Sequence, residues 1–438
     1  MNRNLSLVLA SSFLLATTAG CAQTSFAPTG AAVNANETSM VAGKPTGKLI
    51  VKLRPGQTLR MKQSFGAKAT HEIPALNMYS VELPAGKSVA DLKKELGPSV
   101  EYIEQDVTVT LADGLDTLVG SNDAKTTEAK SPFNDPQASE QWAIGVTQQA
   151  EAIAAVKGGT KETVIAIVDT GVDLTHPDLK DKLVKGYNAT GVSGLFGLGS
   201  AKDDNGHGTH CAGIAAAITN NGVGVAGMAP NVKIMPVRVL AGPGSGSLMS
   251  VAKGIVWAAD HGADVISLSL GGAGTMQSLG DAVEHALKKN AVVIAAMGNS
   301  GHNGNPISYP AAYPGVISVG ATDAQDNIAV FSSFNKYCTV SSPGVKIFNT
   351  TPTYDVWLTK NSKGAITKNY GYMSGTSMAT PLVAGLAGLI RSKHPNLSPA
   401  KVKEIREKSA DKVPARAGET WPEKFGHGRI NALKAVSL

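Results

Sequence analysis

Three short motifs carry the residue types of a serine nucleophile and its proton relay. Asp169 lies in VIAIVDTGVD, His207 in DDNGHGTHCAG and Ser377 in SGTSMATP. A serine hydroxyl is a weak nucleophile at neutral pH, so it needs an imidazole to accept its proton and a carboxylate to orient that imidazole. Each residue alone is more often a turn, cap or structural residue. Their joint occurrence predicts acyl transfer, as in the hydrolysis of an amide bond.

The predicted elements place these residues at strand ends and helix starts. VIAIV, residues 164–168, is a β-branched run typical of a parallel strand covered on both faces, and Asp169 follows it. Open α/β sheets bind ligands at that edge. His207 opens an Ala-rich segment that predicts a buried helix. Ser377 begins a second predicted helix, whose Pro381 is tolerated only in the first turn.

The chain order Asp, His, Ser is that of subtilisin-type proteases. The three motifs and the segments between them resemble the subtilase family, and from about residue 134 they are most similar to thermitase-like members. The resemblance implies an α/β fold, a three-layer α/β/α catalytic domain around a largely parallel sheet. It assigns Ser377 as nucleophile, His207 as base and Asp169 as its orienter. Asn299, after the predicted strand AVVIAA, would complete the oxyanion hole with the Ser377 N–H.

The resemblance also implies that the substrate is an extended polypeptide, whose backbone adds to two exposed strand edges. No charged residue occurs among the positions assigned to the primary pocket, so we expect a preference for large apolar or aromatic side chains before the cut. The residues assigned to the edges and pockets are Gly244, Ser245, Gly246, Leu248, Val251, Ser269, Leu270, Gly271, Ala296, Met297 and Gly298. Ordinary turn glycines and core residues are the alternative interpretation.

A structural calcium ion is a further implication of the resemblance. The positions that match the family's high-affinity site are the side chains of Asp135, Asp178 and Asn221 and the backbone carbonyls of Ile218, Val223 and Val225. Six or more oxygen ligands with few carboxylates suit Ca²⁺. Asp178 taken alone could instead be a helix cap. The acidic cluster of a further calcium site in thermitase-like enzymes is missing between the Asp and His motifs, so that site is not predicted.

The start of the chain resembles a secretory signal. Residues 1–21 contain Arg3, an apolar stretch at 5–16 and small residues after it, too short to span a membrane. TTAGC, ending at Cys21, resembles a bacterial lipobox, so a secreted protein and a lipid-anchored cell-surface protein are both open. Residues 22–46 are small and polar and predict a linker.

Residues 47–112 predict a separate α+β unit. KLIVKLRPG, NMYSVELP and VEYIEQDVTVTL are predicted strands, and SVADLKKELG is a short amphipathic helix. The unit resembles the ferredoxin-like, inhibitory propeptide of subtilases, which implies a self-processing zymogen cut near Leu111 to Asp113. A small permanent domain is the alternative. Residues 113–132 would be a linker, and residues 133–438 would form the peptidase. A second cut closer to Phe133 is an alternative.

Charge and cysteine content exclude several other classes. The formal net charge is +6, but the basic residues are dispersed among acidic ones, so nucleic acid is not an expected partner. We expect a monomer that acts on proteins and peptides. Cys211 and Cys338 are expected to be free thiols, although a disulfide is open, and no Cys/His spacing fits zinc. His176 and His210 are interpreted as structural, and residues 353–370 predict a hairpin near the cleft.

Two further functions remain open at this stage. A catalytically silent binding protein could use the same fold, although the intact triad and Asn299 argue against it. A dedicated processing protease would need acidic subsites for paired basic residues, and the sequence offers none.

Overall fold

The computed structural model describes residues 43–60, 66–111, 131–157, 162–191, 200–413 and 423–438. All of them belong to one compact unit, Ser39–Leu438. The expected signal peptide, the lipobox and nearly all of both linkers lie outside the described residues. Among the helices that are described, none is long and apolar enough to cross a membrane.

A seven-stranded parallel sheet forms the centre of residues 133–438, the expected peptidase, which we call the peptidase region. Its strand order is β14-β13-β11-β9-β5-β7-β6. Alternate residues of β5 face opposite apolar clusters. Ile165 and Ile167 pack in the cluster that holds the helices at 207–216 (α5) and 376–393 (α9). Ala166 and Val168 pack in the cluster that holds the helices at 248–260 (α6) and 277–288 (α7). The predicted three-layer α/β/α fold is confirmed. The strands are β5 (Val164–Asp169), β6 (Tyr187–Asn188), β7 (Lys233–Arg238), β9 (Val265–Leu268), β11 (Val292–Ala296), β13 (Ile317–Thr322) and β14 (Val340–Pro343).

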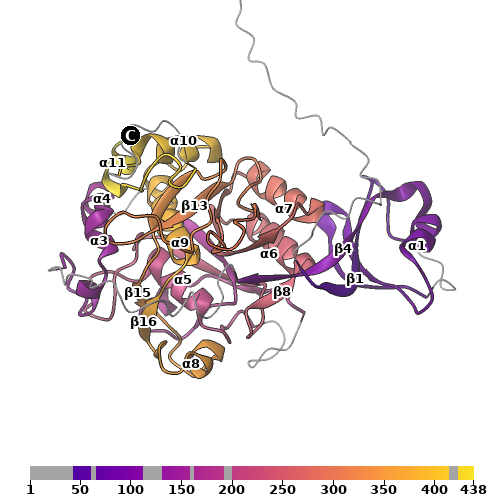
Figure 1. The fold of residues 1–438 in the computed structure, drawn as a ribbon, viewed down its shortest axis with the longest axis horizontal. Helices are drawn as coiled ribbons and strands as arrows, with labels where there is room; N and C mark the ends of the chain where they lie inside the picture. The colour runs from indigo at the N-terminus through magenta and orange to yellow at the C-terminus, as the bar shows by residue number, and fades with distance from the viewer. Residues whose placement is uncertain (1–42, 61–65, 112–130, 158–161, 192–199, 414–422) are drawn as a thin grey trace, which may run out of the picture. The chain divides into compact units, whose positions relative to one another are not determined.

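Helices cover both faces of this sheet (Figure 1). The longest described helix, α9, is buried along almost its whole length. The helices are α3 (Ala143–Val146), α4 (Gln149–Val156), α5 (His207–Ala216), α6 (Leu248–Asp260), α7 (Gln277–Lys288), α9 (Thr376–Lys393), α10 (Pro399–Ser409) and α11 (Ala432–Ser437).

Two sequence-based expectations about this region are wrong. Because α9 begins at Thr376, Pro381 lies beyond the first turn and cannot donate to the Ser377 carbonyl four residues earlier. Ser269 Oγ donates to that carbonyl instead, at 2.9 Å, so the helix tolerates the proline. The expected hairpin at 353–370 is a longer connection: β15 (Ile347–Thr350) pairs with β16 (Tyr370–Met373), and the short helix α8 (Trp357–Asn361) lies between them.

The N-terminal region is an antiparallel sheet with one described helix. β1 (Pro45–Leu53) lies between β3 (Met78–Glu82) and β4 (Val100–Leu111), and β2 (Lys68–Ile73), which we did not predict, pairs with β3. The predicted helix is α1 (Val89–Leu96), which starts in a capping box between Ser88 and Asp91. The region has its own apolar cluster, and β1 begins inside the expected linker.

The strand β4 continues past this sheet. It pairs antiparallel with β8 (Ser245–Ser247) and β10 (Leu270–Ala273), and β10 pairs in turn with β12 (Ser308–Tyr309). Figure 1 shows β4 running from β1 to β8. The two regions therefore share one continuous backbone ladder.

Candidate active site

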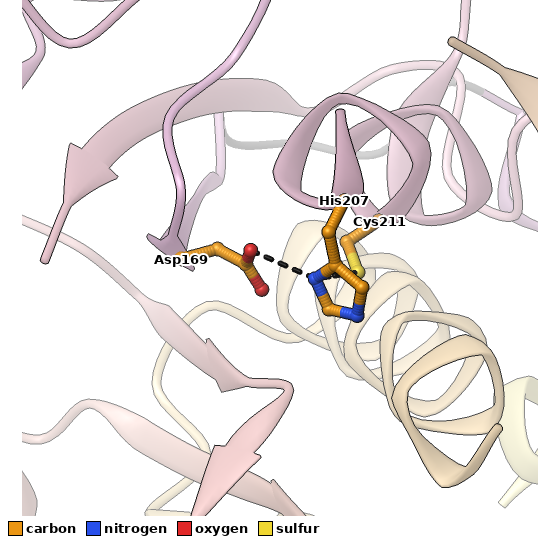
Figure 2. Close-up of side chains that lie close together, drawn as sticks. All are labelled: Asp169, His207 and Cys211. Carbon is orange, nitrogen blue, oxygen red and sulfur yellow. Dashed lines mark hydrogen bonds and ion pairs between the residues drawn. The ribbon is translucent and has the colours of Figure 1, made fainter. Parts of the chain in front are cut away.

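The fold brings Asp169 and His207 into direct contact. Asp169 ends β5 and His207 is the first residue of α5. His207 Nδ1 lies 2.8 Å from Asp169 Oδ1, and both side chains are buried. The Thr170 N–H donates to the same carboxylate oxygen at 2.7 Å, which fixes the carboxylate. Figure 2 shows this carboxylate facing the imidazole.

Cys211 lies one turn along α5 from the imidazole (Figure 2), with Sγ 3.8 Å from His207 Nδ1. Asp169, His207 and Cys211 could geometrically hold a metal ion. Burial raises the pKa of the Cys211 thiol, which disfavours the thiolate that a metal would need. Cys211 and Cys338 are both free and buried, as expected.

Ser377 is the second residue of α9, at the end of the helix where backbone N–H groups favour negative charge. Its Oγ donates to the Ser269 carbonyl at 3.2 Å. Asn299, after β11, accepts from Thr376 N and Thr376 Oγ1, both at 2.9 Å, through Oδ1. Because its oxygen is held by Thr376, the amide can offer its N–H₂ group as a donor.

Two further histidines are held by backbone carbonyls. His210 Nε2 lies 3.1 Å from the Gly371 carbonyl, and burial lowers the pKa of His210 to about 3. His176 Nε2 lies 2.9 Å from the Asn369 carbonyl. These contacts support the structural interpretation of both residues.

The two strand edges predicted to bind substrate hold β4. Val109 pairs with Gly246, Thr110 with Ser245 and Gly271, and Leu111 with Leu270. The Leu111 N–H donates to the Gly244 carbonyl at 2.9 Å. The last described residues of the N-terminal region therefore occupy the position of an extended peptide.

Several of the predicted pocket residues belong to the same apolar cluster as this strand. Val109 belongs to the same apolar cluster as Leu248 and Val251 at the start of α6. Ala296 ends β11 and is followed by Met297 and Gly298, so these three residues lie beside Asn299. Ala296 and Met297 are buried.

Sequence reasoning missed two carboxylates of β4 that contact helix starts in the peptidase region. Glu104 accepts from the N–H groups of Gln277 at 2.9 Å and Ser278 at 3.0 Å, in the first turn of α7. Asp106 accepts from Met249 N in the first turn of α6, at 3.2 Å. We call this pair the capping carboxylates. Their spacing of two places them on one face of a strand, which was the available signal.

Three side chains of the expected calcium site, those of Asp135, Asp178 and Asn221, belong to one group of hydrogen bonds. Asp135 accepts from the N–H groups of Asn220 and Asn221, and Asn221 Nδ2 donates to Asp178 Oδ1 at 2.8 Å. A Cβ at Gly224 would lie 2.3 Å from Asp178 Oδ2, so only glycine lets the loop close on that carboxylate. Ile218, Val223 and Val225 lie in the same loop, and the Val225 N–H donates to Asp178.

Comparisons with known proteins agree with this architecture. Residues 160–428 match the Subtilase family, and residues 34–106 match the Fervidolysin N-terminal prodomain. Thermitase from Thermoactinomyces vulgaris is 43% identical over 304 residues, which cover 69% of this chain and 98% of thermitase. The alkaline protease of Alkalihalobacillus alcalophilus is 36% identical over 367 residues, 84% of this chain and 81% of that protein.

Among solved structures, the chain is similar to fervidolysin from Fervidobacterium pennivorans, described as a keratinolytic enzyme related to subtilisin. The TM-score is 0.72 at 27% identity, over 90% of this chain and 62% of fervidolysin. The chain thus spans less of fervidolysin than of thermitase. With the family match over most of the peptidase region, the chain belongs to the subtilase family and is a subtilisin-like serine peptidase with a fervidolysin-like prodomain.

Proposed function

We propose that the chain is the self-processing zymogen of a secreted endopeptidase in which Ser377 is the nucleophile, His207 the general base and Asp169 its orienter. The observation that supports this most strongly is the buried 2.8 Å contact between His207 and Asp169. With Nδ1 bonded to the carboxylate, Nε2 is the nitrogen that takes the serine proton. Ser377 Oγ then bonds to the peptide carbonyl carbon, and the same proton passes to the departing amine. Water repeats the cycle on the acyl-enzyme and releases the acid.

The oxyanion of the tetrahedral intermediate would be held by the Ser377 N–H and the Asn299 amide. Thr376 orients that amide through two hydrogen bonds to Oδ1. Loss of one such donor costs about 3 kcal/mol, a magnitude that comes from subtilisin.

The prodomain would inhibit the site until it is cut and released. Leu111 pairs with Leu270, and the residue before Leu270 is Ser269, whose carbonyl accepts from the Ser377 hydroxyl. One further residue along the ladder brings the chain to the nucleophile, so we place the first cut at the Ala112–Asp113 bond. Both residues of that bond lie outside the described residues. N-terminal sequencing tests this placement: a mature enzyme that still begins before Lys48 would contradict the propeptide function.

Apolar or aromatic side chains are the preferred residues before the cut in this proposal. Ala296, Met297 and Gly298 provide no charge to recognise a basic side chain. Val109 of the prodomain packs with Leu248 and Val251, which favours an apolar residue at that more distant position too. A peptide-library profile dominated by Lys or Arg before the scissile bond would contradict this specificity and favour a dedicated processing protease.

A structural calcium ion would be held by Asp135, Asp178 and Asn221 together with the carbonyls of Ile218, Val223 and Val225. The donor set fits the ion, because all of these groups offer oxygen and only two are carboxylates. Such an ion would join the loop at 218–225 to Asp135 and would stabilise the fold. It takes no part in the proton transfers above.

Export rests on residues 1–21, which lie outside the described residues. The cut at Ala112–Asp113 would remove Cys21, so the intact mass of the uncut Ser377→Ala protein distinguishes the two routes. A lipid on Cys21 would indicate a cell-surface form, and an unmodified product in the medium would indicate ordinary secretion.

The central experiment compares the wild type with Ser377→Ala by mass spectrometry and casein cleavage. Removal of the nucleophile should lower turnover by about a millionfold. Shortening and casein cleavage in the wild type alone would support the proposed function. Equal maturation and equal cleavage in both proteins would overturn it. Full-length, inert protein in both cases would favour a silent binding protein or a need for another processing enzyme.

A further inference from the structure

The buried carboxylate of Asp203 has no assigned role, although it lies close to the proposed catalytic pair. Asp203 is fully buried. Its Oδ1 accepts from Thr170 Oγ1 and from the N–H groups of Asn205 and Gly206, each at 2.9 Å. Its Oδ2 accepts from Thr209 N at 2.9 Å and Thr209 Oγ1 at 2.7 Å. Five donors thus converge on one side chain.

These donors require the charged form of Asp203. Thr170 Oγ1 already accepts from Gly208 N, and Thr209 Oγ1 already accepts from Asp173 N, both at 2.9 Å. Each hydroxyl therefore has its proton available for Asp203. Burial raises the pKa of the Asp203 carboxyl. A protonated carboxyl, however, would point its own proton at one of the five groups that donate to it, and that hydrogen bond would be lost. The positive end of α5 further favours the charge.

The same bonds connect Asp203 to both partners of the catalytic contact. Thr170 directly follows Asp169, and its hydroxyl joins Asp203 to the N–H of Gly208, which directly follows His207. Asp203 therefore joins the end of β5 to the first turn of α5. The relative position of these two backbone segments decides whether His207 Nδ1 meets Asp169 Oδ1.

The connection between β15 and β16 covers the outside of the loop at 203–206, which carries Asp203. Tyr354 OH donates to the Asp203 carbonyl at 2.8 Å. The N–H groups of Trp357 and Leu358 donate to the carbonyls of Asp204 and Asn205, both at 3.0 Å. The loop is thus held by its own carboxylate on one side and by α8 on the other, which keeps water from Asp203.

We infer that Asp203 is a positioning residue that holds Asp169 and His207 in register and places a fixed negative charge near the imidazole. This inference rests on the proposed function. The titratable groups that face His207 are Asp169 on β5 and Cys211 and His210 on α5. Tyr354 and the pair of Asp204 with Arg238 lie beside Asp203. Among them, Asp203 is the carboxylate bonded to both backbone segments of the catalytic contact.

The test compares Asp203→Asn with Asp173→Asn, each produced as the full-length chain and assayed after its prodomain has been cut and released. Asp173 is an equally buried carboxylate that accepts four bonds from Thr175 and Thr353, with none from Thr170. We expect Asp203→Asn to lower kcat about a hundredfold with KM changed less than about threefold. Loss of a negative charge disfavours the imidazolium, so the acidic limb of the kcat/KM profile should move to lower pH. Asp173→Asn should lose thermal stability but keep the wild-type kcat and the wild-type position of the acidic limb.

A second pair of variants applies if Asp203→Asn does not fold. Thr170→Val removes the bridging hydroxyl and should lower kcat about tenfold, whereas Thr170→Ser should restore it. Equal kcat losses in Asp203→Asn and Asp173→Asn, or wild-type kcat in Thr170→Val, would overturn the positioning role alone. Activity in Ser377→Ala would overturn the proposed function as well.

Discussion

The strand β5 and the C-terminal part of β4 each lie between two partner strands, but they are held by different means. β5 is parallel to β7 and β9, and its residues 165–169 are buried between two apolar clusters. β4 is antiparallel to β8 and β10, and several of its residues outside that ladder are exposed or half-buried. The prodomain interface adds polar contacts, which include the capping carboxylates and the contacts of Lys52 and Tyr102 with Asp281 at 2.7 and 2.8 Å.

Under the proposed function, this difference separates a permanent strand from one that is released after the cut. The apolar contacts of β5 are lost only when the domain unfolds, whereas those that β4 makes through Val107, Val109 and Leu111 are lost when the prodomain leaves. Backbone bonds at a sheet edge and charged caps can be replaced by water and substrate, since their net contribution is small. The following predictions test this distinction, from the largest expected effect to the smallest.

The capping carboxylates should control how long the cut prodomain stays bound. Each carboxylate at a partly buried helix N-terminus contributes up to about 2 kcal/mol, so the double variant Glu104→Gln, Asp106→Asn should shorten the delay between first cut and casein cleavage up to several hundredfold. Glu101→Gln, an exposed residue of the same strand, is the matched control. An unchanged delay in the double variant would show that the backbone ladder alone holds the prodomain.

Calcium removal should weaken the peptidase region and leave the prodomain interface unaffected. At a free concentration a hundred times its Kd, a bound ion contributes about 3 kcal/mol. Chelation should therefore shorten the thermal-inactivation half-life of the mature enzyme by about a hundredfold. Asp178→Asn should inactivate quickly with or without chelator. A chelator effect that persists in Asp178→Asn would assign the ion to another site.

The interior should gain stability when its buried charge at Arg406 is removed. Arg406 is buried on α10, its Nη2 donates to the Val383 carbonyl at 2.8 Å, and Nε and Nη1 have no partner among the described residues. Burial lowers its pKa to about 9. Arg406→Leu should stabilise the protein by about 2 kcal/mol, measured as slower thermal inactivation.

Arg391 provides the control for this experiment. It is equally buried, but it donates to the carbonyls of Asn290 and Pro395. Arg391→Leu should therefore destabilise the protein, because it leaves those carbonyls without a donor. Stabilisation by both substitutions would indicate a general preference for leucine on these helices.

Acid should weaken the prodomain interface through His71. The ring lies against Gly191 of the peptidase region, and burial together with Lys253 and Lys48 lowers the pKa of His71. Bound His71 thus resists protonation. Its contribution to prodomain binding is complete above the ordinary pKa of histidine and is lost as the pH falls through the lowered pKa of the bound residue. Asp106 lies near the same face, and burial raises the pKa of its carboxyl. Protonation of Asp106 at lower pH therefore favours the bound prodomain and opposes the effect of His71.

The measurement is the delay before casein cleavage at two pH values. Acidification should shorten this delay less in the His71→Gln variant than in the wild type. An identical pH dependence in both proteins would assign the effect to other groups.

The sequence predicted the elements that carry local patterns. The β-branched run before Asp169, the Ala-rich segment of α5 and the amphipathic segment of α1 all form as expected. The sequence did not indicate the hydrogen bonds between residues that lie far apart in the chain. Nothing near Pro381 indicates that Ser269 satisfies the freed carbonyl, and nothing near Asp203 indicates its bond with Thr170, because these two partners come from other elements.

Helix α8 was missed for a similar reason. Its five residues are too few for a periodic pattern, and its N–H groups are satisfied partly by a loop more than a hundred residues earlier. Of the candidate site, the triad motifs were evident from sequence, whereas the residues that hold them depend on tertiary packing.

If the prodomain inhibits as proposed, the shared ladder of β4 also makes latency depend on covalent connection. While the chain is intact, the inhibitory strand is tethered to its own site, at an effective concentration that no dilution of the protein can change. After the cut, the same strand competes at the concentration at which it is actually present. A crowded compartment would therefore keep the processed enzyme silent, and dispersal into a large volume would activate it.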